Sequence, residues 1–255
     1  MLKIVIKSFC ESWEQLFKCP VPEKFKQMGS TTIGLDWLVK ACFPVNGALL
    51  ALVFYLLALL VASLSAPVGG AIIFAIAATI LSEAVNAFRD LNNLGYFITL
   101  RLAGADNQSA IRNLQKVNCN SLAIIAQVFT LLIKAVCFGF LFHYSHLYWL
   151  VIVFVLSFTM QAQLGKLPDI DSKLVQHPED HHMRFTFWYV AAFLCLLFFL
   201  KAPVLILISF AVCLLYSLSM FAWLWRELGG ASPAITALTG YSLQLLLLLF
   251  GLMLG

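Results

Sequence analysis

One group of polar residues has the spacing of a metal-binding stripe. Its four members are separated by three, four and three positions: Glu83, Asn86, Asp90 and Asn93. If they belong to one helix, this spacing places them on a single face. Carboxylate and amide oxygens are suitable ligands for Mg²⁺, and a substrate diphosphate and water would complete the octahedron. The spacing alone favours a polar helix end that faces lipid headgroups, and a Mg²⁺ site is the alternative interpretation.

A second polar group contains two histidines. His177 and His181 are four positions apart, a spacing that could bind zinc. Pro178 argues against a continuous helix between them, and no cysteine lies nearby to strengthen the site. A solvated interfacial loop is therefore the favoured interpretation of this segment, although Asp169 and Asp171 could assist a metal held elsewhere.

Lys134 lies inside a long apolar run. An ammonium group within a bilayer is costly unless it reaches the interface or meets a partner. Two interpretations stay open: the side chain extends to the external interface, or it has a role in binding.

The elements that carry these residues must lie in a membrane. Of the 255 residues, 62% are apolar and 11% are charged, whereas about 25% of the residues of an ordinary soluble domain are charged. This composition excludes a soluble globular, a disordered or a collagenous chain, and a β-barrel would show short alternating segments instead. No Walker-type, G-x-S-x-G or H-E-x-x-H motif occurs, which excludes the simplest ATPase, hydrolase and metalloprotease classes.

The uncharged intervals predict an all-α, polytopic bundle that forms one integral membrane domain over residues 1–255. Residues 1–40 form an interfacial segment with an amphipathic helix, because apolar and charged side chains fall on opposite helical faces. Residues 41–255 form the transmembrane bundle, with about seven crossings. These are expected near residues 45–65, 70–88, 120–141, 147–164, 185–200, 203–223 and 235–254.

The basic residues predict the orientation of this bundle. All lysines and arginines except Lys134 and Lys201 fall on one side of the expected spans. The opposite turns carry little beyond His143 and His146. Because basic loops are retained in the cytoplasm, we expect the N-terminus and the polar loops to be cytoplasmic.

Several motifs, taken in order, resemble the cobalamin-5′-phosphate synthase family, also called adenosylcobinamide-GDP ribazoletransferase. Lys134 resembles a basic residue often present in the span that follows the 114–118 element in that family. The other matching segments are distributed over nearly the whole chain. Residues 16–22 resemble the family motif F-L-T-R-L-P-V-P, and residues 43–47 resemble F-P-L-x-G. Residues 83–94 occupy the position of H-L-D-G-L-A-D-T-x-D-G, residues 114–118 occupy that of M-K-D-S-R-x-G, and residues 226–230 resemble R-x-L-G-G-x-T-G-D.

The chain is a divergent member by this resemblance, because several acidic motif positions are replaced. Only Asp90 remains of the three aspartates in the first motif, and Asn86 and Asn93 stand for the others. Amide oxygens still bind Mg²⁺, but each lost carboxylate lowers the affinity. The remaining replacements are Val117 and Ala234 for aspartates, Cys119 for an arginine, and Tyr241 and Gln244 for acids of the last helix.

The resemblance implies a membrane-bound transferase of the bacterial cell inner membrane. It would join α-ribazole, or its 5′-phosphate, to adenosylcobinamide-GDP and release GMP, with Mg²⁺ as cofactor. Asp90 and Lys116 would be catalytic, Asp90 as the main metal ligand and Lys116 on phosphate. Arg89 and Lys134 would bind substrate or cofactor. The auxiliary metal ligands would be Asn86, Asn93 and Glu83.

Two other functions stay open at this stage. The missing acids favour a catalytically impaired paralogue that binds corrinoid intermediates or partner enzymes of cobalamin assembly at the membrane. A small transporter is the weaker alternative, because only Lys134 lies deep in a span. The basic residues are not clustered with exposed aromatics, so no nucleic-acid partner is expected.

Overall fold

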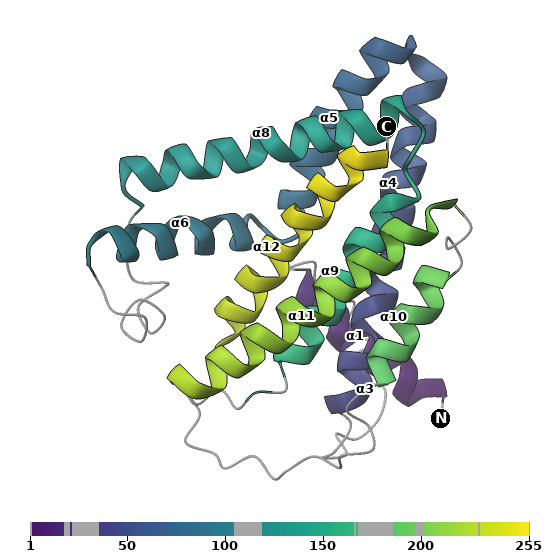
Figure 1. The fold of residues 1–255 in the computed structure, drawn as a ribbon. Helices are drawn as coiled ribbons and strands as arrows, with labels where there is room; N and C mark the ends of the chain where they lie inside the picture. Colours follow the sequence, from purple (N-terminus) through teal and green to yellow (C-terminus); the bar gives the residue numbers. More distant parts are fainter. Residues whose placement is uncertain are drawn as a thin grey trace.

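The computed structural model describes residues 2–17, 21, 36–104, 119–165, 167, 186–196, 201–228 and 230–254, and these residues form helices, turns and short connections. The chain enters the bundle through a hairpin, α4 and α5, and ends on α12 (Figure 1). The helices are α1 (Leu2–Leu16), α3 (Asp36–Ala41), α4 (Phe43–Leu64), α5 (Pro67–Ala84), α6 (Arg89–Leu102), α8 (Ser121–His143), α9 (Trp149–Leu164), α10 (Thr186–Leu196), α11 (Pro203–Leu228), α12 (Pro233–Gly251) and the 3₁₀ turn η3 (Leu252–Leu254).

Each of the seven expected crossings coincides with a helix, but only part of the expected count is confirmed. Within the described ranges, five helices are long and apolar enough to cross a bilayer: Leu38–Leu64, α5, α8, Pro203–Arg226 and Pro233–Leu254. The other two are shorter, since α9 has 16 residues and the described part of α10 has 11. Five candidate spans fit a helical membrane protein, and a total of seven stays a prediction.

The outer surfaces of these helices are apolar, as a lipid environment requires. On α4 the side chains of Leu52, Leu56 and Leu60 are each at least half exposed. On α5 and α8 the same holds for Ile76 and Leu132. Soluble proteins rarely expose apolar surface on this scale, so the surface agrees with the composition.

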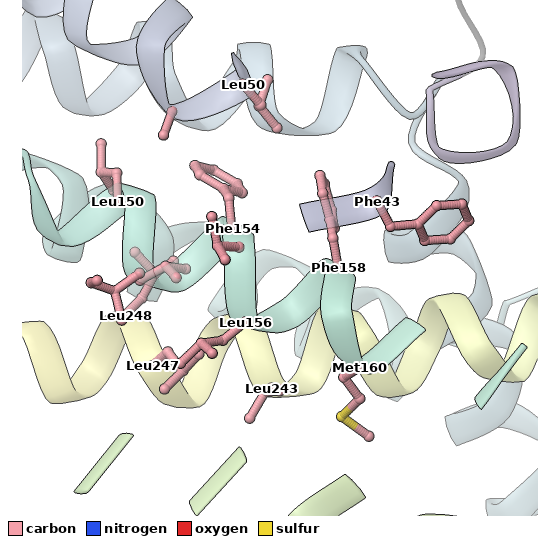
Figure 2. Close-up of a cluster of buried hydrophobic side chains, with 14 of the residues drawn as sticks. Phe43, Leu50, Leu150, Phe154, Leu156, Phe158, Met160, Leu243, Leu247 and Leu248 are labelled. Carbon is pink, nitrogen blue, oxygen red and sulfur yellow. The ribbon is translucent and has the colours of Figure 1, made fainter. Parts of the chain in front are cut away.

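The centre of the bundle is α9, which is apolar all round and buried along nearly its whole length. It lies between α4 on one side and α12 on the other, and it also contacts α10 and α11. Figure 2 shows Phe154 and Phe158 of α9 pointing toward α4, and Leu156 pointing toward Leu247 of α12. A short helix of this kind is typical of a core helix that its neighbours shield from lipid.

The contact between α4 and α9 depends on a glycine. A Cβ atom on Gly47 would lie 2.7 Å from the carbonyl oxygen of Phe154, so the two backbones meet at this point. Next to it, the rings of Phe54 and Phe154 stack with centroids 5.2 Å apart. The absence of a side chain at residue 47 therefore sets how closely α4 can pack on the central helix.

The C-terminal end of helix α1 packs on the bundle. Leu16 and Phe17 are buried, and the Phe17 ring lies 5.6 Å from the ring of Phe158. The side chains of Ser12 and Asn46 form a buried hydrogen bond between α1 and α4. This end of α1 therefore contacts protein, and the expected interfacial position of residues 1–40 stays a prediction.

The chain turns sharply between α5 and α6, which corrects the expectation of one helix through residues 83–93. Residues 85–88 form turns, and Ala87 and Phe88 adopt left-handed backbone angles with φ of 50° and 57°. The amide of Phe88 donates to the carbonyl oxygen of Glu83 at 2.8 Å, which closes the end of α5. Glu83 therefore ends one helix while Asp90 and Asn93 begin another, and the four polar residues do not form a stripe on one helix face.

Candidate functional site

A buried polar cluster forms where α5, α8 and α12 meet, and we call Ser82, Glu83, Lys134 and Tyr241 the Glu83 cluster. The Lys134 ammonium lies 2.5 Å from Oε1 of Glu83 and 3.5 Å from the Ser82 hydroxyl. The Tyr241 hydroxyl donates to the same Oε1 at 2.9 Å. One carboxylate oxygen thus joins three helices that are far apart in the sequence.

Lys134 pairs inside the bundle and does not extend to the interface. Its side chain is 1% exposed and that of Glu83 is fully buried. The ammonium also lies 4.2 Å from the centroid of the Tyr241 ring, a cation–π contact. Because a lone charge in a bilayer is strongly unfavourable, each member of this pair makes the other tolerable.

A second polar group begins α6, and Asp90 is its centre. The carboxylate of Asp90 accepts hydrogen bonds from Nδ2 of Asn86 at 2.7 Å and from Nε of Arg89 at 3.1 Å. Arg89 also donates to the carbonyl oxygen of Gln15 at 3.2 Å, which ties α1 to this end of the bundle. The Arg89 side chain keeps 23% exposure, whereas that of Asp90 keeps 4%.

Burial raises the pKa of the Asp90 carboxyl above its ordinary range, and the adjacent Arg89 guanidinium partly opposes this rise. Asp90 lies on α6, outside the five candidate spans. Desolvation disfavours the charged carboxylate, so the folded chain holds this proton more readily than the unfolded chain does.

A dependence of stability on pH follows from this shift. The pKa of Asp90 is higher in the folded chain than in the unfolded chain. Its contribution to folding stability is therefore fully present below the unfolded-state pKa and is lost as pH rises through the folded-state pKa. We expect the thermal midpoint to decline over that interval in the wild type and to decline less in Asp90→Asn. Melting curves between about pH 4 and about pH 8 measure this difference. If the thermal midpoint changed with pH equally in the two proteins, the raised pKa of Asp90 would be contradicted.

Further contacts hold α6 against its neighbours. Nδ2 of Asn93 lies 3.5 Å from the carbonyl oxygen of Ala234 at the start of α12. Nε2 of Gln127 on α8 donates to the carbonyl oxygen of Leu91 at 2.9 Å. Helix α6 lies alongside α8 (Figure 1), so the Asp90 group and the Glu83 cluster are fixed on the same framework of helices.

The contacts of the expected Mg²⁺ ligands differ between Asp90 and Glu83. Asp90, Asn86 and Asn93 carry oxygen atoms of the kind that Mg²⁺ prefers. The Asp90 carboxylate is itself paired with the partly exposed Arg89 guanidinium, and Asn86 turns its amide nitrogen toward this carboxylate, so Mg²⁺ binding would require both side chains to move. Glu83 suits the ion poorly, because the Lys134 ammonium already lies at its carboxylate and would repel a divalent cation. Its Oε2 atom is buried without a hydrogen-bond partner in the described part of the chain.

Other expected site residues fall outside this arrangement. Among the residues that the structure describes, no group of three or more His, Cys, Asp or Glu side chains could hold a metal ion. Lys116, expected on phosphate, and the loop with Asp169, Asp171, His177 and His181 lie outside the described residues.

Sequence reasoning did not include Tyr241, Ser82 or Gln15 among the site residues. Tyr241 had one available signal, because a tyrosine in a long apolar run needs a partner for its hydroxyl when it is buried. Gln15 contributes through its backbone carbonyl, which no side-chain pattern reveals.

No protein-family model, curated protein or solved structure matches this chain.

Proposed function

We propose that the protein is a membrane-bound transferase that joins α-ribazole, or its 5′-phosphate, to adenosylcobinamide-GDP and releases GMP. This is the late nucleotide-loop step of cobalamin biosynthesis. The proposal includes the bacterial cell inner membrane as its location, with the N-terminus and polar loops in the cytoplasm. Its partners would be these two substrates, the lipid bilayer and other cobalamin-assembly enzymes.

The observation that carries the proposal is the convergence of separate motif positions on one site. The resemblance to the transferase family includes the segment 83–94 and Lys134, and the family's acids of the last helix and the segment before it are replaced here by Tyr241 and Ala234. In the fold, Lys134 and Tyr241 both contact Glu83, and Asn93 contacts the backbone of Ala234. Positions that correspond to separate motifs of that family therefore meet, although up to 158 residues separate them and two of these positions carry replacements.

The proposed reaction requires little covalent participation by the protein. A hydroxyl oxygen of the ribazole forms a bond to the cobinamide-linked phosphorus, the bond from that phosphorus to the GMP oxygen breaks, and the hydroxyl proton is released. Catalysis of such a displacement depends on positioning and on neutralising the phosphates. When bound, Mg²⁺ would supply charge neutralisation at the diphosphate, held by Asp90 with Asn86 and Asn93.

The chain's own side chains would then orient the substrate. Arg89 is partly exposed and lies beside Asp90, so it can approach a phosphate while remaining paired. Lys116 is proposed to bind phosphate as well. The Glu83 cluster holds α5, α8 and α12 together behind this group, which keeps the start of α6 in place.

The experiment that tests the proposal is a transferase assay in liposomes. Purified protein, Mg²⁺, adenosylcobinamide-GDP and α-ribazole phosphate are combined, and the corrinoid product and GMP are followed by mass spectrometry. Asp90→Ala should lower the turnover by about 100-fold or more, since it removes the remaining carboxylate at the phosphates. Glu11→Ala is the matched control, because it removes a carboxylate on the α1 surface whose 3.8 Å pairing with Lys7 contributes little.

A second candidate is a catalytically impaired paralogue that binds corrinoid intermediates or partner enzymes at the membrane. The specific observation in its favour is the Lys134–Glu83 pair, which removes one of the few acids of the site from metal binding. Folded protein that binds adenosylcobinamide-GDP but forms no product would favour this candidate. Product formation that survives Asp90→Ala would place the reacting metal elsewhere and contradict the roles assigned above.

A further inference from the structure

A large apolar groove runs along α4 and reaches Pro67 at the start of α5, the end of that helix opposite to the candidate site. Its volume is about 830 Å³. Ala51 and Ala58 of α4 form its floor and are almost completely buried. Its walls include Val151 of α9 and Leu194 of α10. These are different residues from the Glu83 cluster and the Asp90 group.

The groove opens on a surface that a bilayer would cover. Leu52, Tyr55 and Leu59 line it and are each about half exposed on α4, which belongs to a candidate span. In the hydrocarbon region the only solvent is lipid, so a groove of this size is filled by hydrocarbon, because empty space forfeits dispersion contacts. The occupant must therefore present an apolar chain.

The groove is long enough to hold an extended hydrocarbon chain that lies along a helix. Its lining on α4 extends from Ala48 to Ser65. At 1.5 Å per residue this corresponds to about 25 Å, against a hydrocarbon core of roughly 30 Å. Small side chains at residues 48, 51, 58 and 62 share one face of α4 and leave the space for such a chain.

Among the described residues that line the groove, all the polar side chains except Tyr55 lie at one end. Ser65, His143, Ser145 and Tyr148 line it where α4 ends, α8 ends and α9 is about to begin. The ring of Tyr144 lies 5.0 Å from that of His143. Tyrosines and histidines at helix ends are typical of the headgroup level of a bilayer. The groove therefore combines a long apolar body with hydrogen-bond donors at the membrane surface.

We propose that this groove binds one phospholipid molecule, with an acyl chain along the alanine face of α4 and the phosphate at the His143 end. The side chains of His143 and Ser145 can donate hydrogen bonds to the phosphate oxygens, whereas a neutral apolar ligand offers these two side chains no acceptor. Because transfer of a lipid chain from the bilayer into the groove gains no hydrophobic free energy, retention depends on packing and on these polar contacts.

Photocrosslinking tests the proposal. The full chain is reconstituted in phosphatidylethanolamine and phosphatidylglycerol vesicles that contain a trace of phospholipid with a mid-chain diazirine. After irradiation, adducts are mapped by mass spectrometry. Adducts should concentrate on groove residues such as Leu59 and Leu194 relative to Ile76, which is exposed on α5 outside the groove. Adducts spread evenly over both sets would overturn the proposal and indicate ordinary annular lipid.

Substitutions distinguish lipid bound in the groove from lipid on the surrounding surface. Ala62→Phe adds a ring to the groove at an exposed position and should reduce groove adducts by about fivefold or more, equivalent to roughly 1 kcal/mol. Leu60→Phe, on an exposed part of α4 that does not line the groove, should leave them unchanged. If gel filtration shows that Ala62→Phe is misfolded, Ala48→Phe tests the other end. A folded groove variant with unchanged labelling would overturn the proposal.

A second arm tests the headgroup. His143→Ala should lower labelling by the phospholipid probe but not labelling by a diazirine fatty acid with the same chain. An equal effect on the two probes, or no effect on either, would overturn the assignment of the phosphate to this end.

Discussion

Replacing Lys134 by methionine should destabilise the protein by about 3–5 kcal/mol, the largest effect that we expect from a single substitution. The methionine has similar length and fits an apolar site, so little packing is lost. The carboxylate of Glu83, however, would then be fully buried without its cation, and only the hydroxyls of Tyr241 and Ser82 would remain near it. Such a charge is expensive inside a bundle that a bilayer surrounds.

The measurement is a double-mutant cycle on protein in nanodiscs, with unfolding followed by tryptophan fluorescence as denaturant increases. Glu83→Gln alone should also destabilise, because it leaves the Lys134 ammonium buried and unpaired. Lys134→Met combined with Glu83→Gln should recover most of the loss, since neither charge remains. Tyr241→Phe removes one hydrogen bond and should cost only about 1 kcal/mol.

Additive effects of the two charge substitutions would contradict a direct ion pair. The same variants also distinguish a structural role from a role in substrate binding. If the pair acts only by holding α5, α8 and α12, the double variant should keep the affinity for adenosylcobinamide-GDP. A double variant that is stable but no longer binds the corrinoid would assign Lys134 to the binding site.

Replacing Gly47 by valine should be the second large effect, with a loss of about 1–3 kcal/mol or more. The added Cβ would lie 2.7 Å from the Phe154 carbonyl oxygen and 3.0 Å from the Val155 amide nitrogen, and both are backbone atoms that cannot rotate away. Helices α4 and α9 must therefore separate, which also disturbs the stacked rings of Phe54 and Phe154.

Gly69 offers the matched control, because a Cβ there meets nothing within 4 Å. Gly69→Ala should stabilise the protein by about 0.5–1 kcal/mol through the higher helix propensity of alanine. Both variants can be compared by thermal unfolding in the same nanodiscs. A midpoint for Gly47→Val equal to that of the wild type would show that the α4–α9 contact is looser than the structure indicates.

Much of the secondary structure could be predicted from the sequence because the bilayer restricts the possibilities. An uncharged run of about 20 residues in lipid must satisfy its backbone within a helix. The run that contains Lys134 was expected at 120–141 and forms α8 at Ser121–His143, and the run after Lys201 begins α11 at Pro203. The final run was expected at 235–254 and forms α12 from Pro233.

The turn between α5 and α6 could not be predicted in the same way. Left-handed backbone angles are usually signalled by glycine or asparagine, but here Ala87 and Phe88 adopt them. The spacing of Glu83, Asn86, Asp90 and Asn93 therefore indicated one helix face, although the stripe is divided by a turn. Contacts of α6 with α8 and α12 hold the unfavourable conformation, and such contacts are not visible in a local pattern.

The sequence by itself determined that the chain is an apolar helical protein suited to a membrane and where its long helices lie. Only the tertiary structure decided that Lys134 pairs with Glu83, 51 positions away, and that Tyr241 completes the contact from 158 positions away. The reason is that hydropathy acts on each segment separately and is therefore local. The partner of a buried charge, in contrast, depends on which helices pack together and at what rotation about their axes.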